Sequence, residues 1–349
     1  RFGGELGIDR QARREGEAFG DDYELPNRTA YNETCAAIAN ALWNQRMFLL
    51  HADGQYVDVL ERILYNGFLS GVSLSGDTFF YPNPLEADGH SAFNIGRPDR
   101  QAWFDCACCP VNVVRFVPSI AGYAYATRRD ELYVNLFLNG TGSVAMSEGA
   151  VKLTQSSQYP WDGRIRIAVE PAAPRELALH VRVPGWALGR PVPGDLYTYR
   201  DAPAEPVELR VNGELQPLAL ERGYAVVRRQ WHPGDTVELW LPMPVRRVAA
   251  HPLVAADVGR VAIERGPIVY CAEGIDHGGR ALDLVLPDAA NLEVLPRPEL
   301  FDGVSVIETD GQRADGAAAR LRLIPYYAWN HRGTGEMAVW LLRERSALK

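Results

Sequence analysis

The stretch Asp105-Cys106-Ala107-Cys108-Cys109-Pro110 joins a cluster of thiols to the start of a helix. Pro110 suits a first helical turn, and the residues after it repeat apolar side chains at helical spacing until Pro118, which should kink the helix. Cys108 and Cys109 then lie at or just before a helix N-terminus, where free amides and the helix dipole favour negative charge. We therefore expect both thiols to ionise more easily than free cysteine.

Two further helices are predicted upstream of this stretch. One covers residues 33–50, and the other covers residues 56–67 behind Asp53, a capping residue type. The connection from Ser70 to Asp105 is rich in Gly, Ser, Pro and Asn. Structureless connections of this length are uncommon in compact domains, so we expect a functional loop.

From about residue 129 the sequence changes to short alternating runs separated by turn signals such as Asn139-Gly140 and Asn212-Gly213. This pattern is typical of a β-sandwich. The runs resume after His251 and indicate a second β-module. We therefore predict three domains: a helical domain at 1–128, a β-sandwich at 129–250 and a second β-sandwich-like domain at 251–349.

Composition narrows the function classes. The 349 residues include 36 basic and 44 acidic side chains, for a net charge of -8, and no Lys/Arg run resembles a phosphate-binding surface, so nucleic acid is not an expected partner. No apolar stretch approaches the roughly 20 residues that cross a bilayer, and no membrane association is expected. Clustered cysteines favour a reducing compartment, so we predict a cytoplasmic protein, with a lost signal peptide as the alternative.

Glu33 and Cys35 could complete a metal site with Cys108 and Cys109, and thiolate ligands select zinc over magnesium or calcium. Residues two apart do not share a helix face, so Glu33 and Cys35 can converge only at an irregular helix entrance. Cys106 could replace one of these ligands. From the residues alone, a catalytic zinc, a structural zinc and buried free thiols all remain open.

Several segments together resemble the bacterial β-L-arabinofuranosidases of glycoside hydrolase family 127. The order and spacing of these segments match that family over nearly the whole chain, although no single segment is specific. The matching segments are Gly16-Glu17-Ala18-Phe19-Gly20, Tyr23-Glu24-Leu25-Pro26-Asn27, Glu33-Thr34-Cys35-Ala36, Cys106-Ala107-Cys108-Cys109-Pro110, Arg265-Gly266-Pro267 and Ile324-Pro325-Tyr326-Tyr327-Ala328-Trp329.

The resemblance implies a role for particular positions. Cys108 matches the cysteine that both contacts zinc and attacks the sugar, and Glu17 matches the general acid/base. Glu61 and Tyr81 fall where the family places substrate-contacting residues. The zinc ligands implied are Glu33, Cys35, Cys108 and Cys109.

The resemblance also implies a fold and an activity. The family's catalytic domain is a barrel of six inner and six outer helices followed by β-sandwich modules, so we expect an α plus β multidomain protein holding the C-terminal part of an (α/α)6 barrel. A missing N-terminal segment or a second chain would complete the barrel. The implied function is a retaining glycoside hydrolase that releases L-arabinofuranose from an arabinoside substrate. The alternatives are a non-catalytic relative with structural zinc and a thiol-based redox or metal-handling protein.

Overall fold

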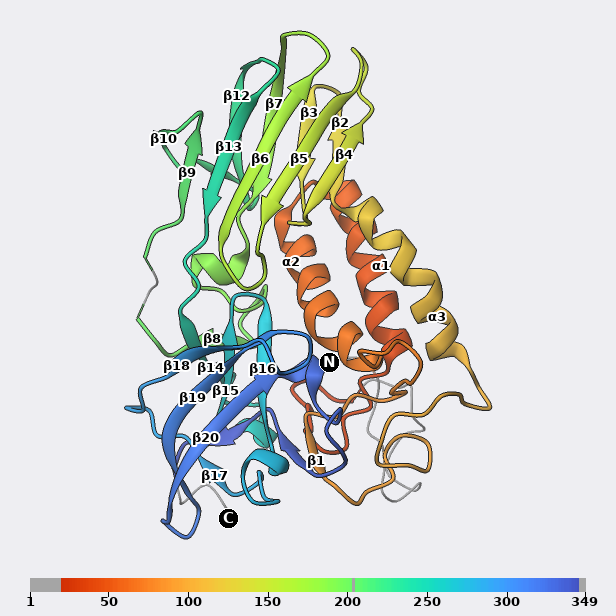
Figure 1. The fold of residues 1–349 in the computed structure, drawn as a ribbon, viewed down its shortest axis with the longest axis vertical. Helices are drawn as coiled ribbons and strands as arrows, with labels where there is room; N and C mark the ends of the chain where they lie inside the picture. The colour runs from red at the N-terminus through yellow and green to blue at the C-terminus, as the bar shows by residue number, and fades with distance from the viewer. Residues whose placement is uncertain (1–19, 203–204, 345–349) are drawn as a thin grey trace.

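A computed structural model describes residues 20–202 and 205–344, in which a helical layer lies beside two β modules (Figure 1). The three predicted helices are confirmed as α1 (Thr34–His51), α2 (Gly54–Arg62) and α3 (Cys108–Phe116). Asp53 caps α2, since its carboxylate accepts from the Gln55 amide at 3.0 Å. Helix α2 continues as the π-helical η1 (Ile63–Phe68) and the 3-10 turn η2 (Leu69–Gly71).

Helix α3 ends two residues before Pro118 and continues as the 3-10 helix η3 (Val117–Tyr123). Proline lacks the amide hydrogen that the next α-helical bond would need, so the regular helix ends here, where the sequence predicted a kink. The helices share a core that includes Ile38, Leu60 and Val113. Among the described residues, no helix is both long and apolar enough to span a bilayer.

The β-sandwich predicted after residue 129 consists of two antiparallel-rich sheets that pack face to face over an aliphatic core. Burial alternates along its strands, as expected where one face of a sheet is buried. The five-stranded sheet has the order β11 (Leu220–Glu221), β12 (Tyr224–Trp231), β7 (Arg175–Arg182), β3 (Glu131–Val134) and β2 (Tyr125–Arg128). The six-stranded sheet has the order β10 (Glu214–Gln216), β9 (Glu208–Val211), β13 (Asp235–Trp240), β6 (Arg164–Pro171), β5 (Val151–Ser157) and β4 (Gly140–Val144).

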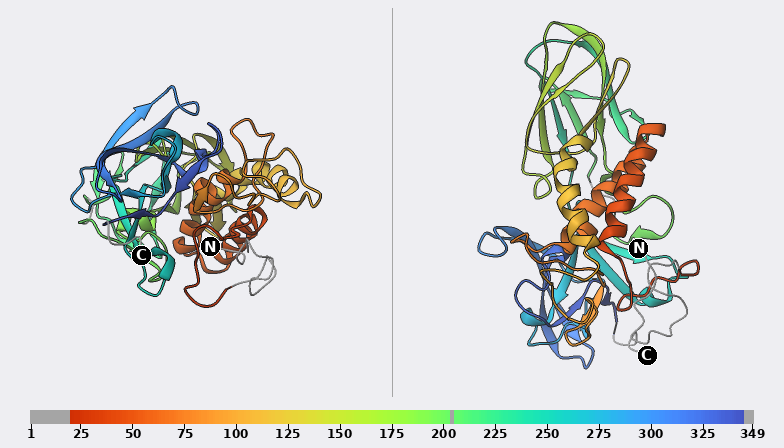
Figure 2. Two further views of the ribbon diagram at one scale, coloured as in Figure 1. Left: turned by 90° about the horizontal axis from the view of Figure 1, so that it is seen from below. Right: turned by 90° about the vertical axis from the view of Figure 1, so that its right-hand side faces the viewer.

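The helical layer packs against one end of the five-stranded sheet and covers that part of its outer face (Figure 2). The ring of Phe48 on α1 lies 5.8 Å from that of Tyr133 and 6.2 Å from that of Tyr224. Both tyrosines belong to the core that the helices share. The central strand β7 is therefore buried on both faces over most of its length.

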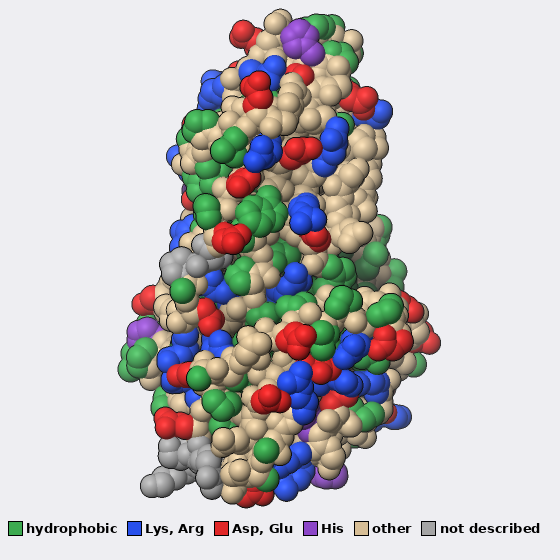
Figure 3. Space-filling view, turned by 60° about the vertical axis from the view of Figure 1, so that its left-hand side comes forward, with side chains coloured by type: hydrophobic (Ala, Val, Ile, Leu, Met, Phe, Trp, Pro, Cys, Tyr) green, Lys and Arg blue, Asp and Glu red, His purple; other side chains and the backbone are tan. Residues whose placement is uncertain are grey.

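The C-terminal module is built on one eleven-stranded sheet with apolar clusters. Its main path runs through β1 (Glu86–Asp88), β21 (Glu336–Ala338), β16 (Ile268–Glu273), β20 (Ala318–Pro325), β19 (Val304–Arg313), β17 (Leu284–Val285), β22 (Leu341–Leu342), β15 (Arg260–Arg265), β14 (Val245–Ala250) and β8 (Tyr197–Tyr199), and β18 (Glu293–Arg297) pairs with β19. Basic and acidic side chains are interspersed on the face shown in Figure 3.

The described residues thus form a multidomain, mostly β structure with few helices. The division at residues 128 and 250 stays a prediction, and strand pairing crosses it, since β1 and β8 join the C-terminal sheet. The described helices do not form an (α/α)6 barrel, so that part of the predicted fold class also stays a prediction.

Candidate metal centre

The four predicted zinc ligands converge. One ligand atom each from Glu33, Cys35, Cys108 and Cys109 lies within 4.8 Å of the other three. Glu33 is the N-cap of α1, with an extended backbone (φ -60°, ψ 139°) and no capping hydrogen bond from its side chain. Glu33 therefore lies at the non-helical entrance to the helix to which Cys35 belongs, which meets the geometric condition that the sequence set.

The spacing of the ligand atoms fits a tetrahedral metal site. With Zn–S bonds of about 2.3 Å and Zn–O bonds of about 2.1 Å, a tetrahedron has S···S edges of about 3.8 Å and S···O edges of about 3.6 Å. The sulfurs of Cys108 and Cys109 are 3.9 Å apart, and each lies 3.5 Å from Oε1 of Glu33. Three thiols and one carboxylate are also a donor set that suits zinc.

The thiols differ in acidity. Hydrogen bonds from Cys109 and Asn112 outweigh burial and lower the pKa of Cys35 to about 7. Burial, together with the negative neighbours Cys35 and Glu33, raises the pKa of Cys108 to about 12, and contact with Cys35 raises that of Cys109. The predicted easier ionisation of Cys108 and Cys109 is therefore wrong for the thiols by themselves, because these effects exceed that of the helix terminus. A bound cation would reverse this balance.

Tyr81 from the long loop reaches the same cluster. Its hydroxyl lies 2.9 Å from the sulfur of Cys108, while its ring is buried against Phe104 with centroids 5.4 Å apart. The amide nitrogen of Asn112 donates to the sulfur of Cys35 at 3.0 Å. The sequence reasoning missed Asn112, although its position one helical turn after Cys108 could have indicated it.

Cys106 is exposed and lies outside the four-ligand group, 3.8 Å from the Tyr81 hydroxyl. The structure therefore favours Cys109, which is fully buried, over Cys106 as a ligand. The predicted acid/base, Glu17, lies outside the described residues.

Glu61 is not part of the cysteine cluster. Its buried carboxylate pairs with Arg182 of β7 and accepts from Tyr159 at 2.6 Å and from Trp186 at 3.3 Å. These partners occupy both carboxylate oxygens and connect α2 to the β-sandwich. The placement argues against the substrate contact predicted for Glu61 and indicates a structural ion pair instead.

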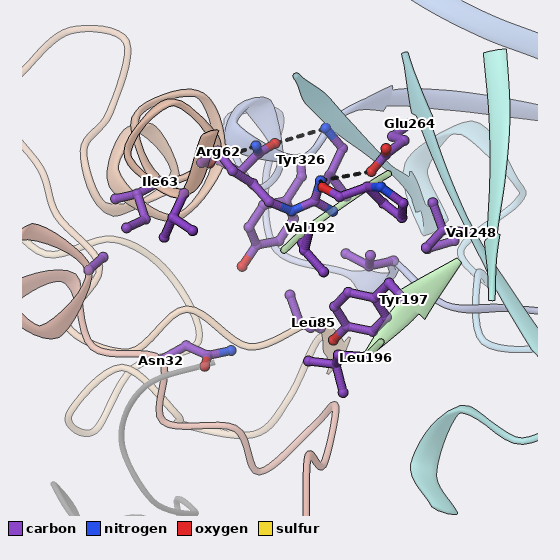
Figure 4. A pocket seen from close by; sticks show the side chains of 18 of the residues that line it. Asn32, Arg62, Ile63, Leu85, Val192, Leu196, Tyr197, Val248, Glu264 and Tyr326 are labelled. Carbon is purple, nitrogen blue, oxygen red and sulfur yellow. Dashed lines mark hydrogen bonds and ion pairs between the residues drawn. The ribbon is translucent and has the colours of Figure 1, made fainter. Parts of the chain in front are cut away.

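A cavity of about 360 Å³ lies between the helical layer and the C-terminal sheet (Figure 4). Glu33 belongs both to its lining and to the metal cluster, and Asn32 and Asn83 line it as well. On the opposite wall Arg62 donates to Glu264 at 2.9 Å. The segment that carries Glu33 therefore separates the cavity from the cysteine cluster and lines the cavity itself.

Comparison with known protein families agrees with this arrangement. Residues 4–122 match the catalytic domain of β-L-arabinofuranosidases of glycoside hydrolase family 127 (GH127). Residues 131–243 match the middle domain of those enzymes, and residues 245–342 match the C-terminal domain of the same family.

Individual relatives extend the match over almost the whole chain. A non-reducing end β-L-arabinofuranosidase of Bifidobacterium longum is 36% identical over 94% of this chain and 51% of its own. A solved GH127 β-arabinofuranosidase superposes with a TM-score of 0.90 and 46% identity, over 96% of this chain and 53% of that one. The GH127 β-L-arabinofuranosidase of Geobacillus stearothermophilus T6 gives 0.85 and 41%, over 94% and 52%. The chain therefore spans about half the length of these relatives.

Proposed function

The chain belongs to glycoside hydrolase family 127, and on that premise we propose that it carries the zinc and nucleophile half of a retaining β-L-arabinofuranosidase. The observation that carries the proposal is the convergence of Glu33, Cys35, Cys108 and Cys109, with ligand-atom separations that fit tetrahedral zinc. The relatives supply the substrate class, since those compared are named as arabinofuranosidases.

In this proposal Cys108 is the nucleophile. Its sulfur attacks the anomeric carbon, a C–S bond forms as the bond to the leaving oxygen breaks, and that oxygen takes a proton from Glu17. Glu17 then removes a proton from the water that attacks the same carbon, and the Cys108 sulfur leaves as a thiolate with the bonding electrons. Two displacements at one carbon retain its configuration. The role of Glu17 rests on the sequence resemblance.

The protein must keep the attacking sulfur ionised, because burial and the neighbouring Cys35 and Glu33 together raise the pKa of Cys108 to about 12. Bound zinc would supply the positive charge that holds Cys108 as a thiolate. The Tyr81 hydroxyl, 2.9 Å from this sulfur, donates to the thiolate and orients it. Cys35 and Cys109 carry the remaining negative charge that keeps the sulfur electron-rich.

We further propose that additional polypeptide covers the exposed side of the helical layer and completes the sugar pocket. Large apolar side chains are exposed on two helices, among them Trp43 (67%) and Leu50 (75%) on α1 and Val114 (68%) on α3. An apolar surface of this kind marks an interface. The portion of the relatives that this chain does not match is the proposed occupant, consistent with an (α/α)6 barrel.

The test compares wild type with Cys108→Ser on an aryl β-L-arabinofuranoside, each in the presence of the additional polypeptide that completes the pocket, while zinc content is measured by elemental analysis. The proposal predicts zinc in both proteins, turnover only in the wild type, and a pentosyl adduct on the peptide containing Cys108 when a trapping substrate is used. Equal turnover in Cys108→Ser would contradict the nucleophile assignment. Zinc without an adduct or turnover would favour a structural site.

A further inference from the structure

We infer that Asn83 is the positioning residue that holds Glu33 in place as a metal ligand and couples it to Tyr81. The inference rests on the proposed metal site and names a residue that neither the metal cluster nor the chemistry includes. Its basis is a set of hydrogen bonds between the loop at residues 80–83 and the two residues that flank Glu33.

The side-chain amide of Asn83 bonds to both neighbours of Glu33. Its nitrogen donates to the carbonyl of Asn32 and to the hydroxyl of Thr34, each at 3.0 Å. Its oxygen accepts from the hydroxyl of Ser70 at 2.6 Å. Both amide donors and the acceptor are therefore engaged, which leaves this buried side chain, 2% exposed, a single orientation.

The backbone of Asn83 repeats the connection. Its amide donates to the carbonyl of Tyr31 at 3.1 Å, and its carbonyl accepts from the side chain of Asn32 at 3.2 Å. The segment that approaches Glu33 from the N-terminal side is thus bonded to Asn83 at two consecutive residues. A side chain bonded in this way cannot shift without moving the backbone around Glu33.

Thr34 transmits the same constraint to the loop that bears Tyr81. Its amide donates to the carbonyl of Tyr81 at 2.9 Å, and its hydroxyl donates to that of Phe80 at 2.8 Å. Thr34 also lies close to Gly71. Only glycine leaves room for Thr34 here, because a Cβ at Gly71 would lie 2.4 Å from the Thr34 hydroxyl oxygen. Asn83 therefore fixes Glu33 relative to Tyr81, and both of these residues contact the sulfur of Cys108.

The hydrogen bonds of Asn83 keep the carboxylate of Glu33 in the position that a metal ligand needs. The residue precedes α1, its side chain makes no cap bond, and its carboxylate must remain 3.5 Å from two sulfurs. Residues that orient metal ligands without touching the metal typically change metal affinity by about 10- to 100-fold when mutated. Loss of Asn83 should release Glu33 while leaving the three cysteines on α1 and α3 in place.

The experiment measures Zn²⁺ affinity of the reduced full chain by competition with a chromophoric chelator, in wild type, Asn83→Ala and Asn83→Asp. Asp keeps the size and the acceptor for Ser70 but lacks the amide donors. Asn66→Ala is the matched control, because Asn66 is also buried in the cavity wall but bonds to Arg62, Pro267 and Val269.

We expect both Asn83 variants to bind Zn²⁺ about 10- to 100-fold more weakly than wild type, with Asn66→Ala unchanged. With Co²⁺, the visible ligand-field bands of the Asn83 variants should shift while the thiolate charge-transfer bands keep their intensity, because only the carboxylate is released. Asn83→Asp serves if Asn83→Ala does not fold. Wild-type affinity and an unshifted cobalt spectrum in a folded Asn83 variant would overturn the inference. If the wild-type chain itself binds neither metal, the proposed metal site has failed instead.

Discussion

Substitution of Arg182 by Met should test the ion pairs that join the helical layer to the β-sandwich. The guanidinium is fully buried and donates to the carbonyl of Asn135 at 2.6 Å, to Asp58 at 2.8 Å and to Glu61. Met retains the apolar stem and removes the charge. Two carboxylates would then remain between α2 and β7 without their counter-ion.

The expected loss can be estimated from this geometry. Removing one member of a buried ion pair destabilises proteins by roughly 3–5 kcal/mol, and the lost bond to Asn135 adds about 1 kcal/mol. At about 2–4 °C per kcal/mol for domains of this size, the apparent Tm should fall by at least about 8 °C. Burial already raises the pKa of Asp58 to about 6, and loss of Arg182 should raise it further.

That shift sets the sign of the pH dependence. A carboxyl group whose folded-state pKa is raised binds protons more readily in the folded protein, so its contribution to stability increases as pH falls through that pKa. The destabilisation of Arg182→Met should therefore be smaller at pH 5 than at pH 8.

The assay is thermal unfolding of the full chain followed by circular dichroism at both pH values, with Arg228→Met as control. Arg228 lies on the neighbouring strand β12, and its ion pair among the described residues is the exposed one with Glu221, 3.7 Å apart, so its loss should change stability by less than about 1 kcal/mol. If Arg182→Met unfolds like the control, or is more destabilised at pH 5, the reasoning is refuted.

Removal of metal by a chelator should lower the apparent Tm, and added Zn²⁺ should restore it, because a ligand at 1,000 times its Kd stabilises the folded state by about 4 kcal/mol; an unchanged Tm would count against the site. Tyr81→Phe should lower kcat by about 10- to 100-fold with little change in KM, since it removes only the hydroxyl 2.9 Å from Cys108; steady-state kinetics on the aryl arabinoside decide this. Burial lowers the pKa of His331 to about 4, so its contribution to stability is complete above pH 6.5 and is lost as pH falls through 4. His331→Gln should therefore show a weaker dependence of Tm on pH in this range than wild type.

Much of the fold could be predicted because it depends on local patterns. The starts of α1 and α2 follow from a helical repeat and from the cap at Asp53, and the β-sandwich follows from alternation between turn signals. Strand β5 has alternating burial in the structure, but its sequence does not show a regular apolar alternation. Its inward-facing Gln155 interrupts the apolar pattern by bonding to the hydroxyl of Tyr125, a contact that sequence alone does not reveal.

The candidate site, like the fold, could be predicted only in part from the sequence. Its four ligand types could be chosen from the sequence because thiols are rare and their clustering is unusual. The position of Glu61 could not be predicted, since a glutamate on a helix reads as a surface charge until its partner Arg182, 121 residues away, is known. Asn83 was also missed, because its importance lies in hydrogen bonds to two main-chain segments and not in its own chemistry.

The double burial of β7 bears on how this architecture can be altered. A β-sandwich that is merely appended to an enzyme could be exchanged or deleted like a separate binding module. Here one sheet of the sandwich packs against the other sheet on one face and against α1 on the opposite face. Deletion of residues 131–243 would expose the aromatic surface around Phe48. In chimaeras between family members, the helices and the sandwich should therefore be taken together from the same parent protein.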